Sequence, residues 1–294
     1  MDKYQGGPVT KEQIRPELEQ HKLGRRGKTA KERAIKKTRH PGMIALLLLL
    51  AGCYTVPETG RSAFIIPLGD EVAQGALAFT EIKDKAKTSD DPVSNERVQR
   101  IGRRIAEAVG ADLPGAKWEF VVFEEPKTIN AFALPGGKVG VYSGLLKLVR
   151  SDAELAVVMG HEIAHVTARH GAERMSKGVL VAAAGLAVDA FTRDSRNHDL
   201  MLAAYGLAGG GAMLKFSRDN ESEADYIGIR YAAKAGYDPM AAITFWRAME
   251  KESKGASVPA FLSTHPTHEQ RIADLQQLMP NVLPLYEAAK ERYR

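Results

Sequence analysis

Apolar residues recur at helical spacing along much of the chain, as Val98, Ile101 and Ile105 do within one segment. Spacing and capping residues together predict helices over residues 70 to about 87, 95–109, 151 to about 170, 220 to about 235, a segment opened by 238–239, and 268–278. Ser151 is expected to cap the third of these, and Gly236 to end the fourth.

Two further segments predict a small sheet. Residues 118–123 (WEFVVF) alternate between polar and apolar positions as a strand does, and residues 130–142 (NAFALPGGKVGVY) indicate a hairpin with its turn at Pro135-Gly136-Gly137. Residues 178–191 are nearly all apolar but too few for an ordinary membrane span, so we expect a buried helix, with a membrane-touching helix as the alternative. Helices dominate, and the predicted fold class is α+β.

The beginning of the chain has the order of a secretory signal. Basic residues precede the short apolar run 43–52, which ends in Leu50-Ala51-Gly52-Cys53. This resembles the bacterial lipobox and implies a signal peptide over 1–52, a lipidated tether over 53–69 that begins at Cys53, and one folded domain over 70–294. The implied location is the bacterial cell envelope, lipid-anchored at the outer membrane and facing the periplasm. A short buried helix with an incidental cysteine is the alternative.

Composition narrows the class of protein. Of the 294 residues, 44% are hydrophobic and 26% are charged, which suits a folded core. Much of the net charge of +5 lies in the first 40 residues, without the aromatic interleaving of a nucleic-acid motif, so we expect a solvated tail and no nucleic-acid partner. The single cysteine excludes an intramolecular disulfide and a cysteine-rich zinc site.

The segment His161-Glu162-Ile163-Ala164-His165 carries the main chemical signal. Two histidines four residues apart on a helix share a face, and both can bind one Zn²⁺. Glu162 lies about 100° around the helix, where it can act as general base without binding the metal. The flanking residues are apolar, and two buried histidines need a shared partner. The alternative is an ordinary helix with two surface histidines.

A catalytic zinc needs a third protein ligand from elsewhere in the chain. Glu221 is the best candidate, and Asp225, one turn later, can hold the far nitrogen of a zinc histidine. Glu223 lies about 200° from Glu221 and cannot share its stripe. His170, five residues after His165, is expected to lie off the ligand face.

These motifs in their order (HEIAH, SRDNESEAD and THP, after NAFALPGGKVGVYSGLL) resemble the gluzincin metallopeptidases of the HtpX and CAAX-prenyl-protease family. The lipobox favours its lipoprotein branch, which includes BepA, LoiP and Oma-type proteases. The resemblance implies a mostly helical zincin-type domain with one Zn²⁺ held by His161, His165 and Glu221. It also implies further functional residues: Glu162, Asp225 and His265 near the reaction, and Asn130, Ala131 and Arg271 at the substrate.

The predicted function is zinc-dependent endopeptidase, cleaving unfolded or misassembled envelope proteins through water activated by the metal and Glu162. The substrate class is implied by the resemblance alone, as is a link to the outer-membrane protein assembly machinery. A lipoprotein chaperone for outer-membrane proteins, with little proteolysis, is the main alternative. A structural zinc protein, in which His265 would be the fourth ligand, is the other.

Overall fold

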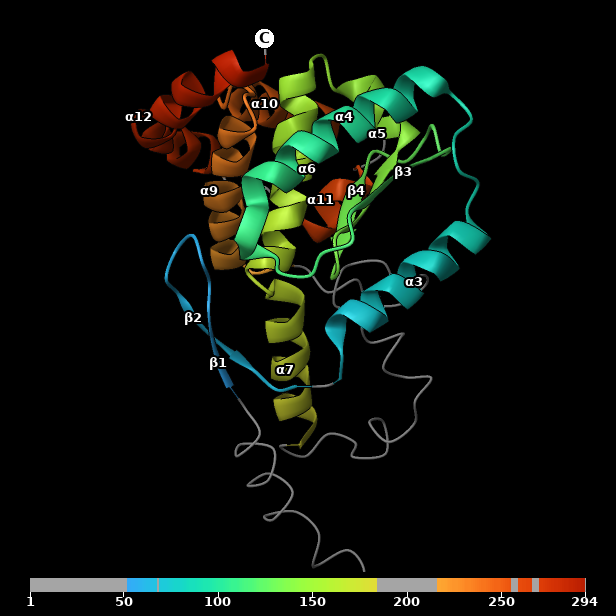
Figure 1. The fold of residues 1–294 in the computed structure, drawn as a ribbon, viewed down its shortest axis with the longest axis vertical. Coiled ribbons are helices and arrows are strands. Elements are labelled where there is room, and N and C mark those ends of the chain that lie inside the picture. The colour runs from blue at the N-terminus through green and yellow to red at the C-terminus, as the bar shows by residue number, and fades with distance from the viewer. Residues whose placement is uncertain (1–51, 68, 184–215, 255–258, 266–269, 294) are drawn as a thin grey trace, which may run out of the picture. The chain divides into compact units, whose positions relative to one another are not determined.

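The computed structural model describes residues 52–67, 69–183, 216–254, 259–265 and 270–293 (Figure 1). The strands are β1 (Gly52–Thr55), β2 (Ser62–Ile65), β3 (Glu119–Phe123), β4 (Ala131–Leu134) and β5 (Lys138–Tyr142). The helices are α3 (Glu71–Lys85), α4 (Pro92–Val109), η1 (Gly110–Asp112), α5 (Ser143–Leu148), α6 (Asp152–Thr167), α7 (His170–Ala183), α9 (Arg218–Lys234), α10 (Ala241–Ser253), α11 (Ala260–Thr264), α12 (Arg271–Lys290) and η3 (Glu291–Tyr293). Helices dominate over two small sheets, which confirms the α+β class.

The three-stranded sheet has the order β3-β5-β4, with β3 parallel and β4 antiparallel to β5. The predicted hairpin is confirmed. Its turn requires glycine, because Gly136 and Gly137 both adopt the left-handed region, with φ of 83° and 80°. This topology leaves β4 at the edge of the sheet.

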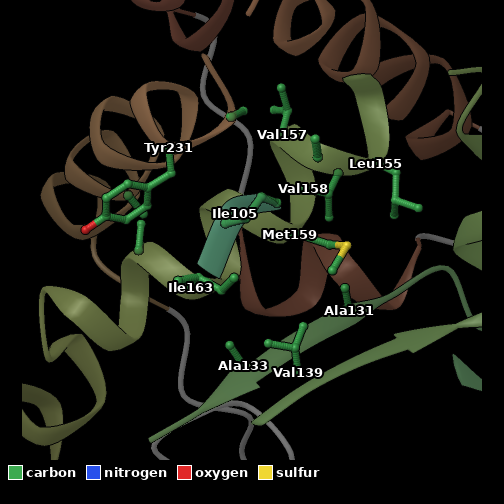
Figure 2. Packing of buried hydrophobic residues seen from close by; sticks show 14 of the residues in the cluster. Ile105, Ala131, Ala133, Val139, Leu155, Val157, Val158, Met159, Ile163 and Tyr231 are labelled. Carbon is green, nitrogen blue, oxygen red and sulfur yellow. The ribbon is translucent and has the colours of Figure 1, made fainter. Parts of the chain in front are cut away.

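Helix α6 lies at the centre of the core and packs against α4, α9, α10 and β4. Ser151 caps it as predicted, since its hydroxyl oxygen accepts from the Glu154 N–H at 3.1 Å. Nearly every residue of α6 is buried. Figure 2 shows Met159 pointing toward Ala131 on β4, with Ile163 further along the same helix. A helix buried on all sides places its polar residues where water cannot solvate them.

Helices α6 and α9 touch through their backbones at two glycines. A Cβ atom added to Gly160 would lie 2.6 Å from the Gly228 carbonyl oxygen. One added to Gly228 would lie 2.6 Å from the His161 nitrogen. The contact holds the two helices closer than side chains would allow.

Part of the predicted tether folds as an antiparallel hairpin of β1 and β2, which pairs Cys53 with Phe64. Val56 of the intervening turn is fully buried, and the Tyr54 hydroxyl donates to the Thr167 carbonyl at 2.8 Å. Cys53 itself is exposed. Its lipidation stays a prediction, and the signal peptide lies almost wholly outside the described residues.

Several helix boundaries were predicted incorrectly. Helix α4 begins at Pro92 rather than at residue 95, and α6 ends at Thr167 rather than near residue 170. Asp238 and Pro239 form a turn rather than the first residues of α10, because the Asp238 carboxylate accepts from the Met240 N–H at 2.9 Å and the helix begins at Ala241. Helix α12 runs past the predicted end at residue 278 and includes two prolines. The apolar residues that it buries offset the hydrogen bonds the prolines remove: Leu275, Met279, Val282 and Ala289.

Within the described residues, no helix combines the length and apolar character needed to cross a membrane. The apolar segment 178–191 begins within α7, and its part beyond residue 183 lies outside the described residues. Its burial or membrane contact therefore stays a prediction.

Candidate metal centre and active site

Side chains from α6, from α9 and from the residue after α11 meet in the interior of the protein. His161, His165, Glu221 and His265 each offer a ligand atom, and these atoms all lie within 4.8 Å of one another. We call this set the four-residue cluster. α6 supplies the two histidines that its spacing predicted, α9 supplies Glu221 from its first turn, and His265 follows α11 directly. All four side chains are buried.

The distances in the cluster suit a small cation. His161 Nε2 lies 3.1 Å from His165 Nε2 and 3.3 Å from His265 Nδ1. Glu221 carboxylate oxygens lie 3.5 Å from both Nε2 atoms and 3.0 Å from His265 Nδ1. Ligands about 2.0 Å from a tetrahedral zinc would be roughly 3.3 Å apart. The nitrogen and oxygen donors therefore fit zinc in both kind and spacing.

The charges in the cluster are strongly coupled. Burial alone would raise the pKa of Glu221, but His265, His161 and His165 hold it well below its usual value. Burial likewise opposes protonation of His161, but Asp225 and Glu221 outweigh it and raise the pKa to about 9. Burial dominates at His165 and holds its pKa well below the usual range. One histidine is thus cationic at neutral pH in the metal-free protein, and its neighbour on the same face is neutral.

Glu162 lies next to the cluster without belonging to it. Its side chain is buried, and Oε1 lies 3.4 Å from His265 Nε2. Among the described residues, Oε1 has no hydrogen-bond partner. Burial raises the pKa of this carboxyl, and the neighbouring His265 and His161 only partly offset the rise. A carboxylate in these surroundings has an enhanced tendency to take up a proton.

Asp225 and Arg271 lie behind the cluster. Asp225 Oδ1 is 3.0 Å from His161 Nδ1, on the side of the ring opposite the cluster. Arg271 donates to both oxygens of Asp225, at 2.7 and 2.8 Å, and to Glu221 Oε2 at 2.9 Å. Its guanidinium lies 3.4 Å from the centre of the Trp246 ring.

The structure places Arg271 behind the metal cluster, and its predicted contact with the substrate stays a prediction. The side chain is only 2% exposed, and its donors face two buried carboxylates. Buried carboxylates need a paired cation, and Arg271 supplies it. The positive charge of Arg271 is also a main reason why the pKa of Asp225 stays low despite burial.

His265 packs between aromatic rings. Its imidazole stacks on Phe261 and Phe216, with ring centres 4.6 and 5.4 Å away. The Phe216 N–H also donates to the carbonyl of Thr264, the residue before His265, at 3.2 Å. These contacts hold the His265 ring in place within the cluster.

Asn130 and Ala131 lie at the start of the edge strand β4. The Asn130 carbonyl accepts from the Tyr142 N–H at 3.1 Å, which makes this pair a hydrogen-bonded one. Hydrogen-bonded and non-hydrogen-bonded residue pairs alternate along an antiparallel ladder. Ala131 and Ala133 are therefore in non-hydrogen-bonded pairs, and their backbone N–H and C=O groups point away from β5. The Asn130 Oδ1 atom is buried and, among the described residues, has no hydrogen-bond partner.

Sequence reasoning missed two residues at the site. His170 and Glu223 contact each other and extend from His165 to the β1–β2 hairpin. Helical periodicity predicts that both side chains lie off the face that carries the metal ligands. The one available signal was a third histidine in the sequence shortly after the HEIAH motif.

Comparison with known proteins gives consistent matches. The sequence model of peptidase family M48 matches residues 92–279 of this chain. The chain is 32% identical to the mitochondrial metalloendopeptidase OMA1 of Saccharomyces cerevisiae, over 82% of this chain and 76% of the relative. It is 37% identical to the OMA1 of Arabidopsis thaliana, over 69% and 41%, and 30% identical to the beta-barrel assembly-enhancing protease of Escherichia coli, over 81% and 50%. The chain spans about half or less of the latter two.

The predicted location at a bacterial outer membrane is wrong. It depended on the lipobox pattern, whereas well-covered relatives from Saccharomyces cerevisiae, Arabidopsis thaliana and Schizosaccharomyces pombe are described as mitochondrial. A charged region before a short apolar run is common to several targeting signals, which is why the pattern misleads.

Proposed function

Because this chain belongs to peptidase family M48, whose members depend on zinc, we propose that it is an endopeptidase that cleaves extended segments of unfolded or misassembled proteins. The observation that carries the proposal is the four-residue cluster with the buried carboxylate of Glu162 beside it, whose Oε1 accepts no hydrogen bond from the residues that the structure describes. The descriptions of the OMA1 relatives support a mitochondrial setting for this activity.

In this proposal, His161, His165 and Glu221 hold the zinc. Bound there, zinc would lower the pKa of a water molecule toward neutrality and polarise the substrate carbonyl. Asp225 would orient the His161 ring from the side away from Nε2, since its Oδ1 forms an ion pair with Nδ1 at 3.0 Å. Arg271 balances the charge of the two carboxylates and prevents Glu221 from turning away.

Glu162 carries the proton in the proposed mechanism. Its Oε1 accepts the proton of the attacking water and later delivers it to the leaving amine. Burial supports the second step, because a carboxyl with a raised pKa retains the proton until the amine takes it.

The substrate would bind as an added strand along β4. The N–H and C=O groups of Ala131 and Ala133 point away from β5, the direction that pairing with an extended peptide requires. Both residues are buried, so the segment that covers them must move before a peptide can pair. An extended backbone is available only in unfolded segments, so this mode of binding selects the proposed substrate class. The buried amide oxygen of Asn130 could accept a donor from the same peptide.

The test compares wild type with Glu162→Gln on an unfolded protein such as casein. We expect proteolysis to fall about 100- to 10,000-fold, the usual contribution of general acid–base catalysis, with the zinc content unchanged. Cleavage at the wild-type rate would exclude Glu162 as the base, and loss of zinc would mean that Glu162 is a ligand. A chaperone without proteolysis, the competing function, predicts no casein cleavage by either protein.

A further inference from the structure

A series of contacts leads from the cluster to the β1–β2 hairpin. His165 Nδ1 lies 2.9 Å from His170 Nδ1, and His170 Nε2 lies 2.9 Å from Glu223 Oε2. Glu223 accepts from the Thr59 hydroxyl and from Arg61 Nε, both at 2.6 Å. We call these residues beyond His165 the relay: His170, Glu223, Thr59 and Arg61.

The contacts leave one consistent set of donors and acceptors for neutral imidazoles. His165 Nε2 faces the cluster, so it must keep its lone pair if it is to bind a cation. The His165 proton is then on Nδ1 and is donated to His170 Nδ1. His170 in turn carries its own proton on Nε2 and donates it to the Glu223 carboxylate. The relay therefore fixes the form of His165 that can act as a ligand.

The backbone adopts an unfavourable conformation to bring His170 to this position. A continuous helix would turn residue 170 about 140° away from His165. Instead α6 ends at Thr167, and Arg169 adopts the left-handed region with φ of 53°. Arg169 is held there by an ion pair with Glu71 and by the Tyr54 ring, 4.9 Å away. Such residues persist where the surrounding structure requires them, often at functional sites.

The imidazole rings of the two α6 histidines are thus held by different kinds of contact. Asp225 contacts His161 directly, whereas His165 reaches a carboxylate only through the imidazole of His170. The hairpin residues Thr59 and Arg61 hold that carboxylate on α9 from the other side. Arg61 also pairs with Glu173 of α7 at 3.0 Å, so the relay links three elements.

We propose that His170 and Glu223 are positioning residues that fix the orientation and tautomer of the ligand His165, and that Thr59 and Arg61 make the β1–β2 hairpin part of the support of the metal site. This rests on the proposed function, since it takes His165 to be a zinc ligand. Outer partners of metal-bound histidines typically contribute 10- to 100-fold to metal affinity.

The test measures zinc affinity of the full chain by competition with a chelator, together with the visible spectrum of the Co²⁺-substituted protein. We expect His170→Phe, which keeps a buried ring but removes both nitrogens, to weaken zinc binding about 10- to 100-fold and to shift the Co²⁺ spectrum. The double variant Thr59→Val, Arg61→Gln lies nearer the surface and is the second probe, in case His170→Phe does not fold. We expect a loss in the same direction.

Glu58→Gln is the matched control. Glu58 lies on the same hairpin and binds the same helix α9, but its ion pairs are with Arg230 and Lys234 rather than with a residue of the relay. We expect this variant to lower the melting temperature of the metal-free protein and to leave zinc affinity within about twofold, well below the usual effect of an outer partner. A merely structural hairpin would instead change zinc affinity equally in the control and in the double variant.

Wild-type zinc affinity and an unchanged Co²⁺ spectrum in the double variant would overturn the proposal, as would an equal loss in Glu58→Gln. These results differ from failure of the proposed function, which would appear as weak or absent zinc binding by the wild-type protein itself.

Discussion

At the scale of single residues, the site combines buried charges that are stable only together. Glu221 contacts two histidines of α6, His265 and Arg271. Removing Arg271, which pairs with both Glu221 and Asp225, would leave buried negative charge without its cation, which costs more than the contact itself contributes. Substitutions here should therefore be interpreted from metal content and stability as well as from activity.

Glu221 and Glu223 offer a direct comparison two residues apart. We expect Glu221→Ala to lose zinc at concentrations at which Glu223→Ala still retains it, because only Glu221 faces the two Nε2 atoms. Zinc content after dialysis against a series of buffered zinc concentrations measures the difference. Equal zinc content in the two variants would remove Glu221 from the ligand set.

His265→Ala separates two roles of that histidine. If His265 closes the metal site, it must leave before substrate enters, and the variant should show faster proteolysis and more autolysis. If it stabilises the developing oxyanion, turnover should fall about a hundredfold with zinc content unchanged. We expect faster proteolysis, because the ring already lies against Glu221 and His161. Turnover and zinc content, measured together, decide between the roles.

The pKa of His161 predicts opposite pH effects on metal-free stability and on zinc binding. Its pKa of about 9 in the folded protein exceeds the ordinary value of 6.5, so protonated His161 stabilises the metal-free fold below pH 6.5, and this contribution is lost as pH rises through 9. Zinc must displace the same proton, so zinc affinity should rise up to about tenfold per pH unit within this window. Calorimetry and chelator competition between pH 6.5 and 9 measure both effects, and neither should persist in His161→Ala.

At the scale of elements, the edge strand β4 makes a distinct prediction. The Ala133 N–H points away from β5, so proline at this position removes no ladder bond but removes a donor to the proposed substrate. We expect Ala133→Pro to lower kcat/KM at least tenfold, mainly through KM, with zinc affinity unchanged. Phe132→Pro is the contrast, because its N–H faces β5 and its loss should lower the melting temperature. Unchanged KM in a folded Ala133→Pro protein would argue against substrate pairing along β4.

The elements also show what the sequence could and could not indicate. His161, Glu162 and His165 lie on one uninterrupted helix, so residue spacing alone determined their relative directions. The ion pairs of Arg271 could not be predicted, because the sequence does not reveal which helix packs over Glu221 and Asp225. His170 was missed because α6 ends at Thr167 and the chain then turns at Arg169, a residue type that periodicity gives no reason to expect in the left-handed region.

At the scale of the whole molecule, the metal site joins the core elements. Its residues come from α6, α9 and the residue after α11, with α12 and the β1–β2 hairpin behind them. A single metal ion bound here would therefore connect elements that lie far apart in the sequence. We expect zinc at about 1,000 times its dissociation constant to stabilise the fold by about 4 kcal/mol and to raise the melting temperature by roughly 10 °C. Calorimetry with and without a chelator measures this, and equal melting temperatures would show that the fold does not depend on the metal.

The backbone contact at Gly160 and Gly228 affects how inactive proteins of this fold can be recognised from their sequences. A methyl group at either position would collide with backbone of the opposite helix beside His161 and push α6 away from α9. His161 and His165 would then lie farther from Glu221, although every ligand, the base and the supporting residues were still present. A protein of this fold can thus become a pseudoenzyme through one hydrogen-to-methyl change, while a search for its catalytic motif still reports an intact peptidase.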